Sequence, residues 1–103
     1  MILITGTVAV APKDREAMLA LGRTQVANSR AEEGNVSYGF YEDMLQPGMC
    51  VFVERWRDQA AVNTHFAKPY SGAFVTQVRA IALNAPAIEL YEVAGVRTIV
   101  PGG

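Results

Sequence analysis

The two side chains of this sequence best suited to chemistry, Trp56 and His65, stand nine positions apart. Trp56 ends a run of β-branched and aromatic residues that predicts a strand, and His65 lies on the helix expected to follow it. An imidazole titrates at about pH 6.5, so His65 could act as a general base near neutral pH. Beside Phe66 it could equally be a packed histidine of the core or its rim, and on the residues alone packing is the more common role.

The strand that carries Trp56 also carries Glu54 on the same face. Trp56 is most often a core residue, whose indole N–H then needs an acceptor; its functional role would be an aromatic wall for a planar substrate. Glu54 is not expected to be buried without a partner, and Arg55 points to the opposite face, so that partner must come from elsewhere. Further candidates for lining a pocket, each with an ordinary structural role as the default, are Asn28, Tyr38, Tyr70 and Phe74.

Several other chemistries lack the residues that they need. A metal site takes several clustered ligands, whereas this chain has a single His and a single Cys on different predicted elements, so we expect no metal. No Gly-rich phosphate loop follows a strand, and no G-x-S-x-G elbow occurs. The net charge of −1 provides no basic surface for nucleic acid or an anionic membrane. Cys50 has no second cysteine to pair with, and its place in a strand predicts a buried thiol.

Length and composition predict one domain spanning residues 1–103. Half of the residues are hydrophobic and 18% are charged, as in a chain with a true core. The start of the sequence lacks the basic segment, apolar run and cleavage site of a signal peptide. No apolar stretch approaches the roughly 20 residues of a membrane span. We therefore expect a soluble, cytoplasmic protein.

Periodicity and breaker residues divide the chain into strands and helices. The predicted order is a strand at Ile2–Val10, a helix at Lys13–Glu32, strands at Val36–Glu42 and Cys50–Trp56, a helix from Asp58 that is interrupted at Lys68–Tyr70, a helix at Ser71–Ala82, a strand at Ala87–Gly95 and a tail at Val96–Gly103. Asp58 suits the N-cap of its helix. Gly34 is free to take a left-handed conformation after the first helix. The inner stripe of that helix is expected to be Ala17, Leu21, Thr24, Asn28 and Ala31.

This β-α-β-β-α-β order predicts a ferredoxin-like α+β fold, in which helices cover one face of an antiparallel sheet. The strand at Cys50–Trp56 is apolar on both faces, so the face away from the helices needs cover as well. A second copy packed sheet to sheet about a two-fold axis is the simplest cover. We therefore expect a homodimer, and the tail around Thr98–Val100 could add contacts with the partner.

Three segments resemble the antibiotic biosynthesis monooxygenase family: Ser29–Tyr38 with its Glu-Glu-Gly run, Val53–Trp56, and His65 with Pro69 after it. The E-x-W sequence followed nine positions later by His is moderately specific, and the resemblance covers nearly the whole chain. It implies a dimeric α+β barrel with a pocket in each subunit between sheet and helices. For many members it also implies oxygenation of electron-rich phenols, quinols or anthrones without a metal or an organic cofactor.

The departures from the family pattern bear on which branch the chain resembles. Phe52 and Val62 stand where the anthrone-oxidising branch has Asn and Tyr, and Val75 stands where the haem-degrading branch has its haem-ligating histidine. The quinol-monooxygenase and autoinducer-processing branches keep the histidine matched by His65, although Tyr70 replaces a second one. Those two branches are the closer match.

The resulting expectation is a cofactor-independent monooxygenase of a small electron-rich aromatic compound of quinol, phenol or anthrone type, with dioxygen as the second substrate. His65 would be the base and Trp56 the platform for the substrate. The residues expected to line the substrate pocket are Asn28, Tyr38, Glu54, Tyr70 and Phe74. Two alternatives stay open: a small-molecule isomerase acting on an enolisable carbonyl compound, and a non-catalytic ligand-binding or regulatory module on the same barrel.

Overall fold

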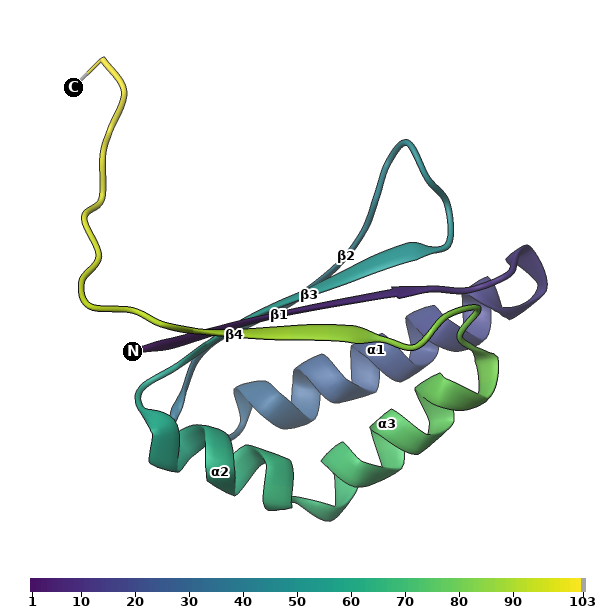
Figure 1. Cartoon of the computed structure of the whole chain (residues 1–103), viewed down its shortest axis with the longest axis horizontal. Helices are drawn as coiled ribbons and strands as arrows, with labels where there is room; N and C mark the ends of the chain where they lie inside the picture. Colours follow the sequence, from purple (N-terminus) through teal and green to yellow (C-terminus); the bar gives the residue numbers. More distant parts are fainter. Residues whose placement is uncertain (103) are drawn as a thin grey trace.

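Four strands and three α-helices make up the part of the chain that the computed structural model describes, residues 1–102. In chain order they are β1 (Ile2–Ala9), α1 (Arg15–Arg30), β2 (Asn35–Glu42), β3 (Met49–Trp56), α2 (Gln59–Ala67), α3 (Pro69–Ile81) and β4 (Ala87–Glu92), with a 3₁₀ turn at Pro12–Asp14 before α1. The strands form one antiparallel sheet in the order β2-β3-β1-β4. All three helices lie on one face of it (Figure 1). The predicted ferredoxin-like α+β fold is confirmed.

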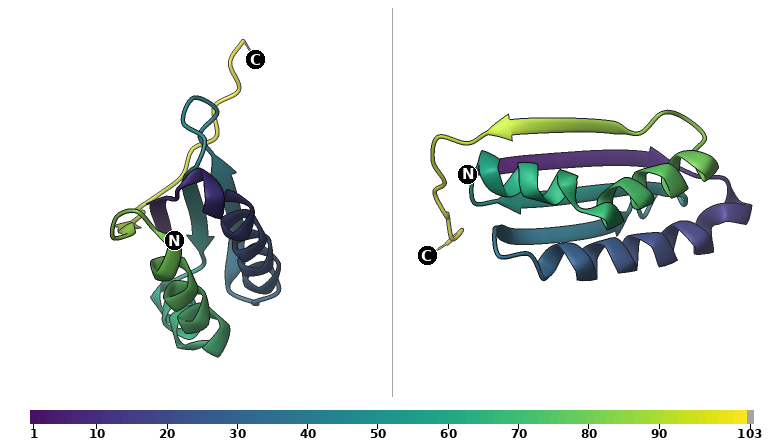
Figure 2. Two further views of the ribbon diagram at one scale, coloured as in Figure 1. Left: turned by 90° about the vertical axis from the view of Figure 1, so that its right-hand side faces the viewer. Right: turned by 90° about the horizontal axis from the view of Figure 1, so that it is seen from below.

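The helices cover the sheet unevenly. Figure 2 shows α1 running along β2 and the pair α2–α3 crossing the middle strands, whereas no helix lies over β4. Every residue of β4 is exposed, including Ile88 and Leu90, which share the helix-side face with Ile4 and Gly6 of β1. The strand also ends earlier than predicted, at Glu92 rather than near Gly95; one more backbone hydrogen bond follows it, from the Val93 N–H to the Met1 carbonyl at 2.9 Å.

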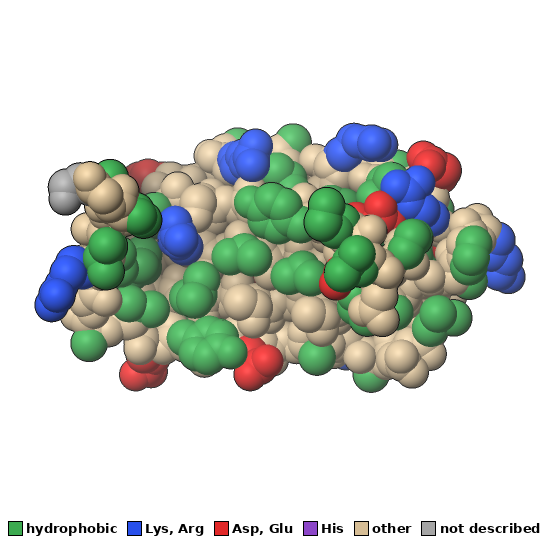
Figure 3. Space-filling view, turned by 90° about the horizontal axis from the view of Figure 1, so that it is seen from above, with side chains coloured by type: hydrophobic (Ala, Val, Ile, Leu, Met, Phe, Trp, Pro, Cys, Tyr) green, Lys and Arg blue, Asp and Glu red, His purple; other side chains and the backbone are tan. Residues whose placement is uncertain are grey.

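The outer face of the sheet, turned away from the helices, is the apolar surface that the sequence predicts. Figure 3 views this face and shows hydrophobic side chains along its middle, with most charged groups toward its rim. Val51 and Val53 are half-buried there, and Tyr41 is exposed. The tail after β4 and the β2–β3 loop both rise on this side of the sheet, at opposite ends (Figure 1). Across residues 1–102, every helix is too short or too polar to span a lipid bilayer.

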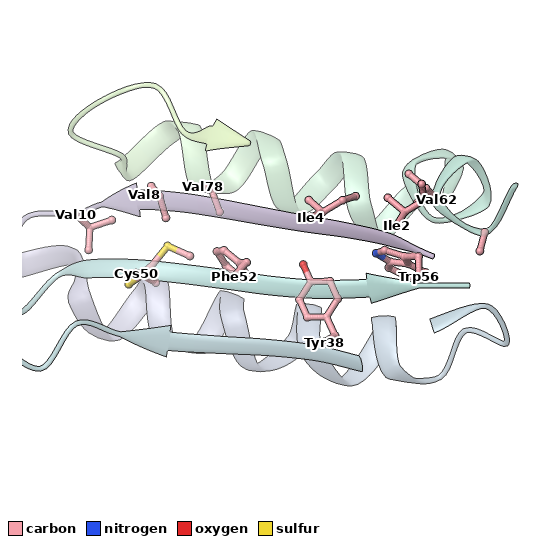
Figure 4. Close-up of a cluster of buried hydrophobic side chains, with 12 residues drawn as sticks. Ile2, Ile4, Val8, Val10, Tyr38, Cys50, Phe52, Trp56, Val62 and Val78 are labelled. Atoms are coloured by element: carbon pink, nitrogen blue, oxygen red, sulfur yellow. The ribbon is translucent and has the colours of Figure 1, made fainter. Parts of the chain in front are cut away.

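The inner face carries the core. On β1 and β3 every second side chain is buried, and strand pairing sets Trp56 opposite Ile2. The thiol of Cys50 is buried, as predicted. The buried hydrophobic cluster, most of which is labelled in Figure 4, comprises Ile2, Ile4, Val8, Val10, Met18, Tyr38, Cys50, Phe52, Trp56, Ala61, Val62 and Val78.

Helix α1 packs against the sheet with a different stripe from the one predicted. Its buried residues are Met18, Gly22, Gln25 and Ser29, each one position after a residue of the predicted stripe. Gly22 is buried because Phe40 of β2 approaches so closely that a Cβ would lie 2.6 Å from its ring. Gln25 and Ser29 make the second half of the buried stripe polar. Asn28 is therefore not on the inner face of α1.

The turn after α1 holds α2 close to the start of β2. Gly34 does not take the left-handed conformation predicted for it, since it is not among the glycines of residues 1–102 with positive φ. It is instead a contact residue, because a Cβ at this position would overlap the Cβ of Ala61 on α2. The Gly34 carbonyl also accepts the Arg57 N–H at 2.9 Å. As predicted, Asp58 caps α2, its carboxylate accepting the Ala61 N–H at 2.9 Å.

Replacing Gly34 by Ala should push α2 away from β2, because Ala61 belongs to a helix and its methyl group cannot rotate aside. Overpacking of this kind typically costs about 1–3 kcal/mol of unfolding free energy. Urea unfolding of Gly34→Ala should show this loss, and a smaller loss when the same change is made in an Ala61→Gly background. Equal losses in the two backgrounds would contradict the contact.

Candidate functional site

Trp56 and His65 meet in the interior, at the end of β3 where α2 begins. Their ring centroids are 4.4 Å apart and the ring planes are inclined by 35°, so the imidazole lies over the indole. The Trp56 indole N–H donates to Oε1 of Glu54 at 3.0 Å, which is the acceptor that a buried tryptophan needs. A partner for Glu54 therefore comes from its own strand face. The indole holds both the imidazole and the carboxylate in place.

Glu32, in the turn after α1, is a second carboxylate at His65. Its Oε2 lies 2.6 Å from Nδ1 of His65 and also accepts the hydroxyl of Tyr70 from α3. An ionised carboxylate only accepts hydrogen bonds, so with Glu32 ionised the Nδ1 of His65 carries the proton. The other ring nitrogen, Nε2, is then free to accept one.

Nε2 of His65 faces Glu54. The distance to Oε1 is 4.0 Å, which is within ion-pair range but longer than a hydrogen bond. The side chains of His65, Glu32 and Glu54 are only 2%, 8% and 9% exposed. One buried imidazole thus stands between two buried carboxylates, one at each ring nitrogen.

Tyr38 completes this cluster from β2. Its ring lies 6.0 Å from that of His65 and 6.5 Å from that of Trp56, centroid to centroid. Figure 4 shows its side chain reaching from β2 toward β3, with the hydroxyl at the leading end. Burial, reinforced by the Glu54 carboxylate, raises the pKa of the Tyr38 hydroxyl. Tyr38 therefore stays protonated and can act as a hydrogen-bond donor.

Burial also raises the pKa of two further groups near His65, Glu54 and Tyr70. It raises the pKa of the Glu54 carboxyl, against the opposing effects of the Trp56 N–H and of His65. Burial and the hydrogen bond to Glu32 raise the pKa of Tyr70 to about 12. A carboxyl with a raised pKa is a stronger base than one in water, which suits proton transfer.

A small cavity lies beside Glu54, between the inner face of the sheet and α3. Its volume is about 90 Å³. Its walls are mainly apolar, with Phe74 packed edge-on against Phe52 at a centroid distance of 5.4 Å. Glu54 and Tyr38 supply polar groups, and the exposed residues Arg79 and Ile88 mark its side toward solvent. We call this the inner cavity.

A second hollow, the outer recess, lies on the opposite side of His65. It measures about 480 Å³, is open to solvent, and lies between the turn after α1 and the helices α2 and α3. Glu32 and Tyr70 line it, together with the cationic residues Arg57 and Lys68. Asn28 lies here too.

The structure brings most of the predicted site residues together but arranges them differently from the expectation. Trp56 and His65 line neither hollow, because both are packed between them. Of the residues expected to line one pocket, Tyr38, Glu54 and Phe74 line the inner cavity, whereas Asn28 and Tyr70 line the outer recess.

Glu32 was missed as a site residue by reasoning from the sequence. The signal that could have found it is helical spacing: Ser29 follows Gln25 by four residues and Glu32 follows Ser29 by three, which continues the buried face of α1 into the turn after the helix. The polar character of those two buried residues indicates a polar interior at that end of the helix.

Comparison with known proteins agrees with this fold and with the resemblance noted above. Residues 1–77 match the family described as "Antibiotic biosynthesis monooxygenase". "Putative monooxygenase YcnE" of Bacillus subtilis (strain 168) is 34% identical over 86 residues, covering 84% of this chain and 90% of that one. "Uncharacterized protein sll1783" of Synechocystis is 35% identical over 98 residues, covering 95% of this chain and 67% of that one. Among solved structures, Rv0793 from Mycobacterium tuberculosis superposes with a TM-score of 0.86 at 25% identity, over 94% of this chain and 98% of that one.

The match over residues 1–77 and the relative YcnE assign the chain to a family. The chain belongs to the antibiotic biosynthesis monooxygenase family.

Proposed function

We propose that this protein is a cofactor-independent monooxygenase of a small electron-rich aromatic compound of quinol or phenol type. The observation that carries the proposal is Glu54, a buried carboxylate with a raised pKa in the wall of an aromatic-lined cavity. The family and the name of the relative YcnE support monooxygenation as the reaction class. The choice of substrate class rests on the cavity.

The proposed reaction begins with removal of a proton from the substrate hydroxyl by Glu54. The resulting anion is electron-rich and passes one electron to dioxygen, after which the two radicals combine to a peroxide. The O–O bond and the C–H bond of the oxygenated ring carbon then break. One oxygen stays on that carbon as a carbonyl, and the other leaves as water with that hydrogen and one returned proton, so the substrate supplies all four electrons. The apolar walls keep water from the anion, and Tyr38 is placed to donate a hydrogen bond to it.

This assignment moves the roles of His65 and Trp56 one step away from the substrate. His65 lines no cavity, so we place it behind Glu54, where its Nε2 can take up the proton that Glu54 accepts. Trp56 is fully buried and stacks on His65, so it orients the pair. The aromatic walls of the cavity are instead Tyr38, Phe52 and Phe74.

The size of the inner cavity favours a single-ring substrate. A cavity of about 150 Å³ is known to hold benzene, and this one measures about 90 Å³ before any side chain moves. Phe74 and Ile88 lie on the less buried side of the cavity and could shift outward. A tricyclic anthrone would need a much larger displacement. The size therefore agrees with the quinol-monooxygenase and autoinducer-processing branches rather than with the anthrone branch.

A small-molecule isomerase is a second candidate, favoured by the same pair of side chains, Glu54 and His65. A carboxylate backed by an imidazole can take a proton from one carbon of an enolisable carbonyl compound and return it to another. Such a reaction needs no dioxygen, so turnover that persists without oxygen would select it. Ligand binding without turnover would instead select the binding or regulatory module.

We propose that the protein works as a homodimer formed through the outer face of the sheet. The outer face carries a continuous row of apolar side chains (Figure 3), and large exposed apolar patches are uncommon on soluble monomers. The tail and the β2–β3 loop flank this face at its two ends (Figure 1). Val96, Ile99 and Val100 of the tail are exposed in the isolated chain, which provides further apolar surface for a partner.

Oxygen uptake by metal-stripped protein, measured against a panel of quinols and phenols, tests the main proposal. Glu54→Gln should lose about 10²-fold or more in kcat/KM, the usual contribution of a general base. Glu16→Gln, a matched change at an exposed carboxylate of α1, should leave the rate unaltered. Because burial raises the Glu54 pKa and the base must be ionised, wild-type kcat/KM should rise with pH through an ionisation above that of an ordinary carboxyl, 4.5. A Glu54→Gln variant with the parent rate and pH profile would remove Glu54 from the mechanism.

Changing His65 should impair turnover strongly even though it lies behind Glu54. His65→Ala should lose about 10²-fold or more in kcat, and His65→Gln should recover little, because an amide keeps a hydrogen bond but cannot take a proton. Phe66→Ala, at the exposed neighbour on α2, is the control. Parental turnover by a folded His65→Ala protein would make His65 structural.

Sedimentation velocity at micromolar concentration should give a dimer, with an interface of roughly 2,000 Å² or more as in obligate pairs. Deleting residues 96–103 should weaken the dimer if the tail contacts the partner. A monomer would contradict the association, and an unchanged dimer after the deletion would reject only the role of the tail.

A further inference from the structure

The inner cavity and the outer recess are separated by the side chain of His65 and its two carboxylate neighbours. Glu54 lines the inner cavity and Glu32 lines the outer recess. The imidazole stands between them, with Nδ1 2.6 Å from Glu32 and Nε2 4.0 Å from Glu54. No other histidine exists in the chain.

This arrangement holds more ionisable groups than packing requires. A buried carboxylate near a second one raises the cost of keeping both charged, and a single imidazole can offset only one of them. A merely structural histidine would be served by one acceptor. The imidazole is also the side chain that can accept a proton at one nitrogen while it releases another from the second.

We propose that Glu54, His65 and Glu32 form a proton relay that connects the inner cavity with the outer recess. This inference rests on the proposed function, because the relay carries the proton that the substrate gives up. Glu54 takes the substrate proton and passes it to Nε2 of His65. The proton on Nδ1 moves to Glu32, where the recess gives access to solvent.

The relay accounts for the proton balance of the reaction. While the substrate anion reacts with dioxygen, its proton is held away from the cavity, so the anion is not reprotonated. When the O–O bond breaks, water formation consumes protons, and one returns through the same three groups. This return restores the proton on Nδ1 of His65. The relay itself involves no net oxidation or reduction.

The 4.0 Å gap between Nε2 and Glu54 is the step that must close during turnover. Oε1 of Glu54 accepts the Trp56 N–H at 3.0 Å and lies 4.0 Å from Nε2. In the proposed relay the carboxylate rotates about this hydrogen bond until one of its oxygens reaches Nε2. Catalytic hydrogen bonds are often long in the absence of substrate and tighten when it binds. The groups that face His65 from every neighbouring element are Glu32 in the turn after α1, Tyr38 on β2, Glu54 and Trp56 on β3, and Tyr70 on α3.

The single histidine allows the relay to be tested directly by NMR of the ¹⁵N-labelled full chain. The wild type should show neutral His65 protonated on Nδ1, and Glu32→Ala should move the proton to Nε2. Glu32→Gln, which keeps the volume and an acceptor oxygen, should leave the proton on Nδ1. Glu16→Gln, an 81% exposed carboxylate on α1 away from both hollows, should not move the proton. A wild-type His65 protonated on Nε2 would overturn the relay.

Kinetics then separate the relay from the proposed function. Glu32→Gln should reduce kcat for oxygen uptake about 10-fold or more with KM nearly unchanged, and should alter the pH dependence of kcat. Glu16→Gln should do neither. Thermal unfolding verifies that both variants are folded. An active wild type whose Glu32→Gln variant keeps the parental kcat and pH profile overturns the relay alone. A wild type without turnover on the whole panel overturns the proposed function, and the relay with it.

Discussion

The short hydrogen bond between His65 and Glu32 is the interaction on which the arrangement of the site depends. It links α2 to the turn after α1 across the interior, and a hydrogen bond to a charged group typically contributes about 1.5–3 kcal/mol. The bond can form only if α2 lies close to that turn. The absent side chain at Gly34 and the cap at Asp58 both serve this approach. The indole of Trp56 then packs against the imidazole of His65, and its N–H holds the Glu54 carboxylate next to it.

The order of strands and helices could be predicted because hydrophobic periodicity and helix-capping or turn residues mark each element within its own segment of the sequence. Alternation along a strand places every second side chain on the same face, and on β1 and β3 one such set is buried against the helices. Asp58 predicted the start of α2 through its side chain alone. The face of α1 could not be predicted in this way, because its buried stripe contains Gly22, Gln25 and Ser29, none of which is large and apolar. Gly22 is buried only because Phe40, from another element, requires the space.

The candidate site could be predicted in part for the same reason. Trp56, Glu54 and His65 lie on one strand and the next helix, so their proximity follows from short-range geometry. Glu32 lies 33 residues before His65, and their contact depends on how α1 and α2 pack. Periodicity within an element carries no information about such a pairing. The same limit explains why Asn28 was expected inside, since a rotation of α1 by one residue moves it to the outer recess.

The uncovered strand β4 bears on how a ligand could reach the inner cavity. The inner cavity lies on the helix side of a sheet that is one layer thick, and its more exposed lining residues lie toward β4 and α3 (Figure 2). The apolar outer face lies on the other side of that layer (Figure 3). In the proposed dimer, the partner subunit and the ligand therefore approach opposite faces of the sheet. A copy packed on the outer face leaves the inner cavity accessible, so under this proposal each subunit binds and releases its ligand without dissociation of the dimer.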